Sequence, residues 1–177
     1  MERYQSGDQA AAQQLVDLVS GRLYAFFASH MGSRSQADDM LQEVWLRLHQ
    51  ARHTYRRSEP VLPWMYAIAR RVRVDNYRRR RRIERREVAS EALHNIPSQA
   101  GPGPTAPSFG ELIASLPESQ REVLIMLKVN GLSIDDVARA TSSTVGAVKQ
   151  KVHRAYIRLR AWLPTARSGQ PSMGEES

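Results

Sequence analysis

The chain is short and strongly basic. It has 177 residues, with 26 Lys and Arg against 18 Asp and Glu, so its formal net charge is +8. The length suits one ordinary domain or two small ones. The charge favours a polyanionic partner, nucleic acid first and an anionic membrane surface second. The absence of cysteine excludes disulfides, zinc–thiolate sites and thiol nucleophiles. The sequence has no secretory-leader pattern and no apolar run of the roughly 18 residues that cross a bilayer, so we expect a soluble, cytoplasmic protein.

A proline-rich segment divides the chain. Residues 94–108, HNIPSQAGPGPTAPS, hold four of the nine prolines and no Asp, Glu, Lys or Arg. Such a stretch cannot continue a helix or form a central strand, and its composition is typical of a linker. Neither flanking block has the alternating pattern of a sheet. The sequence therefore predicts an all-α protein of two small helical domains, residues 1–90 and 110–163, with a flexible linker at 91–109 and a disordered tail at 164–177.

The N-terminal block predicts four helices. Ser6-Gly7-Asp8 is a helix start, the break at 32–33 precedes a helix that begins near Ser35, and Pro63 suits the first turn of the last helix. Apolar residues recur at helical spacing in each segment. The four stripes are Leu15, Leu18 and Val19; Leu23, Tyr24, Phe26 and Phe27; Met40, Leu41, Val44, Trp45 and Leu48; and Trp64, Ile68 and Val72.

The fourth of these helices continues into an arginine-rich run. Between Arg70 and Arg86 there are ten arginines and two acidic residues. The aromatic residues Trp64, Tyr66 and Tyr77 are interleaved with the cations. Rings can stack on unpaired bases while guanidinium groups follow the phosphates, so this pattern favours a surface for single-stranded nucleic acid. The alternatives that remain open are a disordered or merely solvated tail for the arginine run and a core position for Trp64.

The C-terminal block predicts a helix-turn-helix. Short helices are expected at 112–116 and from Pro117 to Gly131; Ser133 caps the next helix, and a long helix follows from about Thr144 to Trp162. The apolar residues expected at the crossing of the last two helices are Val137, Ala138, Val145, Val148 and Val152.

The second helix of this motif usually lies in the major groove, with its N-terminal end at the bases. Lys and Arg can contact phosphates or guanine, and Gln can pair with adenine. The alternative is a basic, solvated helix in an ordinary bundle. The residues predicted to face duplex DNA are Ser133, Thr144, Val145, Gly146, Ala147, Lys149, Gln150, Lys151 and Arg154.

Four stretches in a fixed order resemble one known family. They are GDQAAAQQLVDLVSGRLYAFF, SQADDMLQEVWLRLH, LPWMYAIARRVRVDNYRRRRR and LPESQREVLIMLKVNGLSIDDVARATSSTVGAVKQKVHRAYIRLR. The chain from about Tyr4 to Leu163 resembles bacterial sigma-70-type transcription initiation factors of the extracytoplasmic-function (ECF) group. Three positions differ from the family's common pattern: Ala147 and Gln150 replace Thr and Ser, and Arg71 stands where Asn is frequent. At a fourth, Ser142 replaces the usual turn glycine, so a left-handed conformation there would cost about 1 kcal/mol or more.

The resemblance implies three binding surfaces. The residues implied to dock on the clamp helices of the polymerase largest subunit are Asp38, Asp39, Gln42, Glu43 and Trp45. Simple helix capping is the alternative for the two aspartates. The residues implied to hold and melt the −10 element are Tyr55, Arg56, Arg57, Trp64, Tyr66, Arg70, Arg71, Arg73, Asn76, Tyr77, Arg78 and Arg79. The helix-turn-helix would read the −35 duplex near the polymerase flap region.

The resemblance also implies a specificity subunit of RNA polymerase that responds to stress or an envelope signal. An anti-sigma factor, often membrane-bound in this family, would hold it inactive. We expect no catalytic activity, cofactor, metal site or small-molecule substrate, because no paired carboxylates or phosphate loop are present, and His49 and His53 lack a third ligand. The alternatives are an autonomous helix-turn-helix regulator and a basic RNA-binding or membrane-surface protein.

Overall fold

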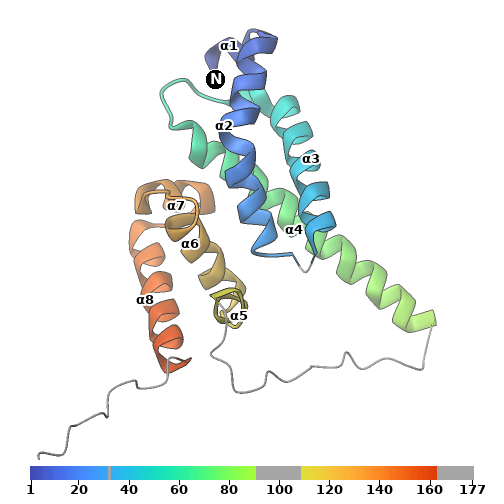
Figure 1. Ribbon diagram of the computed structural model, residues 1–177, viewed down its shortest axis with the longest axis vertical. Helices are drawn as coiled ribbons and strands as arrows, with labels where there is room; N and C mark the ends of the chain where they lie inside the picture. Colours follow the sequence, from blue (N-terminus) through green and yellow to red (C-terminus); the bar gives the residue numbers. More distant parts are fainter. Residues whose placement is uncertain (32, 91–108, 163–177) are drawn as a thin grey trace, which may run out of the picture.

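The computed structural model describes residues 1–31, 33–90 and 109–162, and within these ranges it holds helices and no strand (Figure 1). The expected tail and all but the last residue of the expected linker lie outside the described residues. The elements are α1 (Glu2–Gln5), α2 (Gln9–Ala28), α3 (Arg34–Ala51), the 3-10 turn η1 (Arg52–Thr54), α4 (Val61–Ser90), α5 (Phe109–Ala114), α6 (Glu118–Lys128), α7 (Ile134–Thr141) and α8 (Val145–Trp162).

Short polar side chains begin three of the helices. The Asp8 carboxylate accepts a hydrogen bond from the Ala11 N–H at 3.0 Å, and the Ser33 hydroxyl accepts one from the Gln36 N–H at 3.3 Å. Ser133 forms a reciprocal capping box with Asp136 at the start of α7. These side chains satisfy backbone donors that have no partner within the helix. The helix starts predicted at Asp8 and Ser133 are confirmed.

Helix α2 differs from the sequence prediction. It runs without a break from Gln9 to Ala28, so the separate helix expected around residues 23–27 is its second half. Leu18 was expected on the apolar stripe, but its side chain is 76% exposed. The buried face of α2 includes Val19 and Leu23, and Leu18 lies about 100° around the helix axis from Val19. The short α1, which the sequence analysis missed, packs near the end of α3 through a 3.0 Å hydrogen bond between the Tyr4 hydroxyl and the His49 ring.

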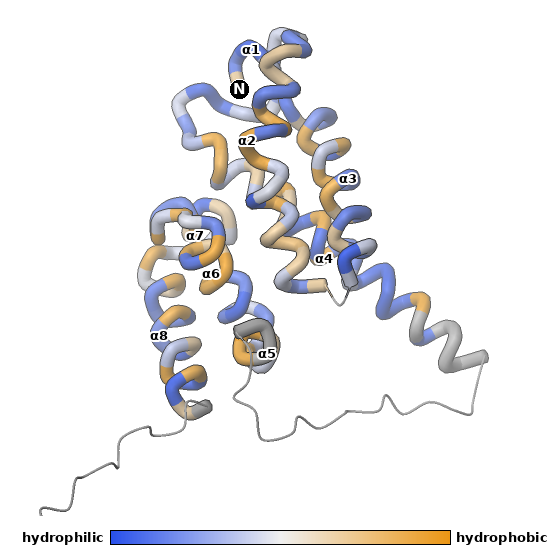
Figure 2. Tube along the Cα trace, viewed as in Figure 1, coloured by the Kyte–Doolittle hydropathy of each residue, from blue (hydrophilic) through white to orange (hydrophobic). Residues whose placement is uncertain are grey.

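The N-terminal domain has one aromatic-rich core between α2, α3 and α4. The Phe26 ring meets the rings of Phe27 and Tyr66 edge to face, with centroids 5.4 and 5.6 Å apart. The far half of α4 extends past α2 and α3 and is mainly hydrophilic (Figures 1 and 2). The core residues are Val19, Leu23, Phe26, Phe27, Ala37, Met40, Val44, Leu48, Met65, Tyr66, Ala69 and Val72.

The C-terminal domain packs α7 and α8 across α6. Val137, Ala138 and Val148 are buried, and Val145 and Val152 pack against them, so the predicted crossing of α7 and α8 is confirmed. The chain turns between these helices at Ser142, whose φ of 51° and ψ of 43° are left-handed. This domain does not stand apart from the first, because α7 packs against α4.

We predict that Phe26→Ala destabilises the protein by about 3–5 kcal/mol, because it leaves a cavity where three aromatic rings meet. Leu18→Ala, on the exposed face of the same helix, should change the free energy of unfolding by no more than about 0.5 kcal/mol. Urea unfolding followed by circular dichroism measures both. Equal losses from the two variants would contradict the observed orientation of α2.

We predict that Ser142→Gly stabilises the C-terminal domain by up to about 1 kcal/mol. Glycine removes the left-handed strain, although it also gives the unfolded chain more freedom. Ser143→Gly is the matched control, and it should destabilise because Ser143 does not have a positive φ. Thermal unfolding of both variants provides the measurement, and a lower melting temperature for Ser142→Gly would refute the strain.

Candidate nucleic-acid interface

The exposed half of α4 is a cationic surface. Tyr77 is 49% exposed, and the Arg81 guanidinium lies over its ring at 5.5 Å from the centroid. The arginines from 78 to 82 are all exposed, and Arg80 donates to the Gln36 side chain at 2.6 Å. This part of α4 therefore presents an accessible ring beside several guanidinium groups, which suits bases and phosphates of an unpaired strand.

The aromatic residues at the other end of α4 have different environments. Tyr66 is fully buried, and burial raises the pKa of its hydroxyl, so its ring belongs to the core and cannot stack on a base. Trp64 is half-buried and meets the Tyr55 ring edge to face, with centroids 5.5 Å apart. Trp64, Tyr55 and Arg56 line one open pocket, to which Arg139 of α7 also contributes. A base could reach Trp64 or Tyr55, but not Tyr66.

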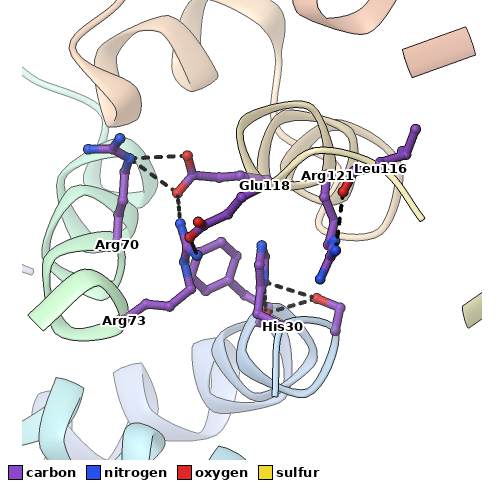
Figure 3. A network of polar contacts seen from close by, with 9 residues as sticks. His30, Arg70, Arg73, Leu116, Glu118 and Arg121 are labelled. Atoms are coloured by element: carbon purple, nitrogen blue, oxygen red, sulfur yellow. Dashed lines mark hydrogen bonds and ion pairs between the residues drawn. The ribbon is translucent and has the colours of Figure 1, made fainter. Parts of the chain in front are cut away.

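The arginines in the middle of α4 are already paired. Arg73 donates to Glu122 of α6 at 2.8 Å and also pairs with Glu118, and Arg70 donates to Glu122 at 3.1 Å (Figure 3). Arg73 and Glu122 are both buried. Arg71, one position along, is exposed, and Asn76 is half-buried. Two of the residues predicted to touch DNA are thus bound by the other domain in this arrangement.

Helix α3 carries the residues implied to dock on polymerase. Asp38, Asp39 and Gln42 are exposed. Glu43 is half-buried and accepts from Arg47 at 2.7 Å. The Trp45 indole N–H donates to the Ser20 hydroxyl of α2 at 3.1 Å, which holds Trp45 against its own domain. The accessible part of this set is therefore the acidic N-terminal half of α3.

Arg47 is a residue that the sequence analysis missed. Besides Glu43, it binds Asp75 of α4 at 2.7 Å, and both carboxylates raise the pKa of its guanidinium, Asp75 more strongly. Asp75 lies amid the arginines of α4, yet its carboxylate pairs across to Arg47 of α3. Glu43 four residues before Arg47 was a readable signal, whereas nothing in the sequence indicated a partner 28 residues away.

The predicted duplex-reading residues divide into structural and accessible ones. The Thr144 hydroxyl accepts from the Ala147 N–H at 3.2 Å and caps α8, and Ser133 caps α7. Val145 packs against the core. Ala147 and Lys151 are half-buried, and the predicted residues of α8 that are accessible are Gly146, Lys149, Gln150 and Arg154. The first turns of α8 thus present small, amide and cationic groups to the surroundings, which fits a helix that enters a DNA groove.

Among the described residues, no cluster of three His, Cys, Asp or Glu side chains is placed to hold a metal ion. No described helix is both long and apolar enough to span a membrane.

His30 lies where α2 meets α4 and α6. Its Nδ1 is 2.7 Å from the Phe26 carbonyl oxygen, to which it donates when the ring is neutral, and its Nε2 is buried without a partner among the described residues. Burial, together with the charges of Arg73 and Arg121, lowers the pKa of His30 to about 4, although the Phe26 carbonyl and Glu122 act in the opposite sense. The ring is therefore neutral at pH 7.

We predict that His30 makes the fold acid-sensitive. Because its pKa is lower in the folded protein than in the unfolded chain, its contribution to stability is present above about pH 6.5 and is lost as the pH falls towards 4. The slope is at most about 1.4 kcal/mol per pH unit. Urea unfolding at several pH values should show a flatter profile for His30→Gln, whose amide can still donate to Phe26. Parallel profiles of unfolding free energy against pH for the wild type and His30→Gln would contradict the lowered pKa of His30.

Comparison with known proteins agrees with this geometry. The Sigma-70 region 2 family model matches residues 14–83, and the Sigma-70, region 4 model matches residues 108–159. The ECF RNA polymerase sigma factor SigF of Caulobacter vibrioides is 31% identical over 157 residues, which cover 88% of this chain and 87% of SigF. The two matched regions coincide with the two helical domains described above.

Two solved structures share the fold. The sigma factor RpoE, in complex with the anti-sigma factor NepR from Bartonella quintana, aligns over 89% of this chain and 99% of its own, with a TM-score of 0.66 and 24% identity. CnrH, in complex with the cytosolic domain of CnrY, aligns over 90% and 92%, with a TM-score of 0.68 and 23% identity. This chain belongs to the sigma-70 family, in the group of extracytoplasmic-function RNA polymerase sigma factors.

Proposed function

We propose that this sigma factor directs core RNA polymerase to promoters through three separate surfaces. The exposed acidic half of α3, with Asp38, Asp39 and Gln42, docks on the clamp helices of the polymerase largest subunit. The cationic face of α4 holds the unpaired −10 strand, and the start of α8 reads the −35 duplex near the flap region. The observation that carries the proposal is that two exposed cationic helices, α4 and α8, belong to different domains of one chain.

The two DNA surfaces suit different forms of DNA. Tyr77 and Trp64 offer rings on which bases can stack once they have left the duplex. The start of α8 offers Lys149, Gln150 and Arg154, whose groups match phosphates and base edges of an intact major groove. A protein with both surfaces can bind a duplex upstream and hold a melted strand downstream. The phosphodiester chemistry belongs to the polymerase, and we assign no catalytic step to this chain.

We also propose an anti-sigma factor as a protein partner. Of the two solved structures described above, one is a sigma factor in complex with an anti-sigma factor, and the other is CnrH in complex with the cytosolic domain of CnrY. In this chain the exposed hydrophobic side chains of Leu18 and Leu46, with the cationic helices, leave surface that such a partner could cover. The cytoplasm, where polymerase and chromosome meet, is the proposed place of action, and a membrane-bound partner would link this site to an envelope or stress signal.

In vitro transcription on genomic fragments tests the function. Core polymerase with this protein should yield transcripts that are absent with core polymerase alone, and their start points would define the −10 and −35 sequences. Tight binding of duplex DNA by the protein alone, with no transcripts, would instead favour an autonomous helix-turn-helix regulator.

We predict distinct effects for two α8 variants on the promoters so found. Gln150→Ala should weaken open-complex formation by about 1–3 kcal/mol and relax selectivity at one −35 position, if Gln150 makes a bidentate base contact. Lys149→Ala should weaken all promoters alike and reduce the salt dependence. Arg158→Ala is the control, because Arg158 lies roughly 12 Å farther along the helix from Gln150. Gel-shift and transcription assays measure these effects; equal losses for all three would argue against a reading role for the start of α8.

A further inference from the structure

The two domains are joined by an ion-pair cluster that is buried at its centre. The Arg73 and Glu122 side chains are only 6% and 5% exposed, and their nearest atoms lie 2.8 Å apart. Glu118, which is 51% exposed, pairs with Arg73 from the rim, and Arg70, which is 40% exposed, binds Glu122 at 3.1 Å. Figure 3 shows Arg70 and Arg73 of α4 facing Glu118 of α6, with His30 between Arg73 and Arg121 in this view. The cluster therefore pairs two cations of the N-terminal domain with two anions of the C-terminal domain.

These carboxylates occupy donors that DNA phosphates would need. Arg guanidinium groups bind carboxylate and phosphate oxygens with the same planar fork, so one group cannot serve both fully at once. The cover continues along α4, because α7 packs against it and Arg139 borders the pocket of Trp64 and Tyr55. In this closed arrangement Arg70 and Arg73 of the proposed −10 surface are held by carboxylates of α6, while Arg71 and the arginines from 78 to 82 stay exposed.

The Arg73–Glu122 pair lies between two domains, and this position determines whether its loss unfolds the protein or only opens it. Inside a single core, removing Glu122 would leave the buried Arg73 guanidinium with only the half-exposed Glu118 as a counter-charge, which would strongly destabilise the fold. Here the two partners lie on helices of different domains, α4 and α6, so Arg73 can regain water when α6 moves away from α4. The energetic penalty then shifts the balance between closed and open arrangements and need not unfold either domain.

We propose that Glu118 and Glu122 compete within the molecule for the arginines that bind the −10 strand, so that domain closure and strand binding exclude each other. The inference rests on the proposed function and adds a regulatory element to it. The exposed arginines beyond Arg73 attract the polyanion first, and phosphates then displace the two carboxylates as the domains separate. An open molecule has the higher affinity for an unpaired strand, because binding to a closed molecule must also supply the free energy of opening the domains.

Interdomain energy transfer tests the closure without DNA or polymerase. The chain has no cysteine, so Ala28→Cys and Ala114→Cys provide two unique labelling positions in different domains. Both residues are exposed; Ala28 ends α2 close to His30, and Ala114 ends α5, where its carbonyl binds Arg121. His30 and Arg121 line one pocket, so the dyes are close in the closed arrangement. Glu122→Gln should lower the transfer efficiency.

Strand binding is measured on the same variants with a fluorescent oligothymidine at low salt. Glu122→Gln should tighten binding by roughly tenfold or more, because a larger share of molecules is open. Asp17→Asn is the matched control. It changes the net charge equally, and within the described ranges the Asp17 carboxylate bonds only to Gln13 of its own helix. The transfer efficiency should therefore be unchanged, and the affinity should change by no more than about twofold.

Two further variants distinguish an effect on domain closure by the Arg73–Glu122 ion-pair cluster from misfolding. Glu118→Gln, at the exposed rim, should lower the transfer efficiency and raise the strand affinity as Glu122→Gln does, but by smaller amounts. If circular dichroism shows that Glu122→Gln is unfolded, the Glu118→Gln result tests the proposal in its place. The double variant Arg73→Gln with Glu122→Gln should recover transfer towards the wild-type value, because no buried charge is left unpaired.

Unchanged transfer efficiency in Glu122→Gln and Glu118→Gln would refute the proposed competition between domain closure and strand binding. Lower transfer efficiency with unchanged strand affinity would refute it as well. Failure of the proposed function is a separate result. In that case the transfer efficiency and the strand affinity change as expected in these variants, but core polymerase with this protein yields no transcripts.

Discussion

Helix α4 carries the constraint on which the rest of the structure depends. One face must fill the core of the N-terminal domain, while the same helix holds a dense row of arginines that repel one another. The molecule meets these demands by distributing counter-charges along the helix from other elements. Asp75 pairs with Arg47 of α3, and Arg73 pairs with Glu122 of α6. The far half, which extends beyond the core, keeps the arginines from 78 to 82 exposed to solvent, and Arg71 is exposed in the near half.

Local features of the fold could be predicted from sequence because their causes are local. The caps at Asp8 and Ser133 bond to backbone groups three residues away, and the left-handed Ser142 follows from the short turn between two packed helices. The crossing of α7 and α8 follows from apolar spacing alone. The burial of Tyr66 and the exposure of Leu18 were harder, since each depends on which neighbours cover that side of the helix.

The interdomain cluster could not be predicted, and the reason is physical. Arg73 and Glu122 are separated by 49 residues, and no periodicity connects two helices that meet across a linker. The sequence shows Arg73 as one cation among ten and Glu122 as an ordinary acid near a helix start. Their burial becomes visible only when the two domains are placed together. The same holds for Arg47, whose sequence neighbour Glu43 reveals only one of its two partners.

Domain closure and the proposed polymerase docking use different faces of the molecule, so the two events can follow one another in a fixed order. Asp38, Asp39 and Gln42 of α3 stay exposed while α6 and α7 cover α4, so a closed molecule can still reach the polymerase through α3. Strand binding and closure, by contrast, compete for Arg70 and Arg73. A ligand that favours the open arrangement raises the affinity for the strand. By thermodynamic linkage, the strand raises the affinity for that ligand by the same factor. A polymerase that holds the C-terminal domain apart from α4 would therefore release the −10 surface only after docking, which limits premature binding of the free protein to other polyanions.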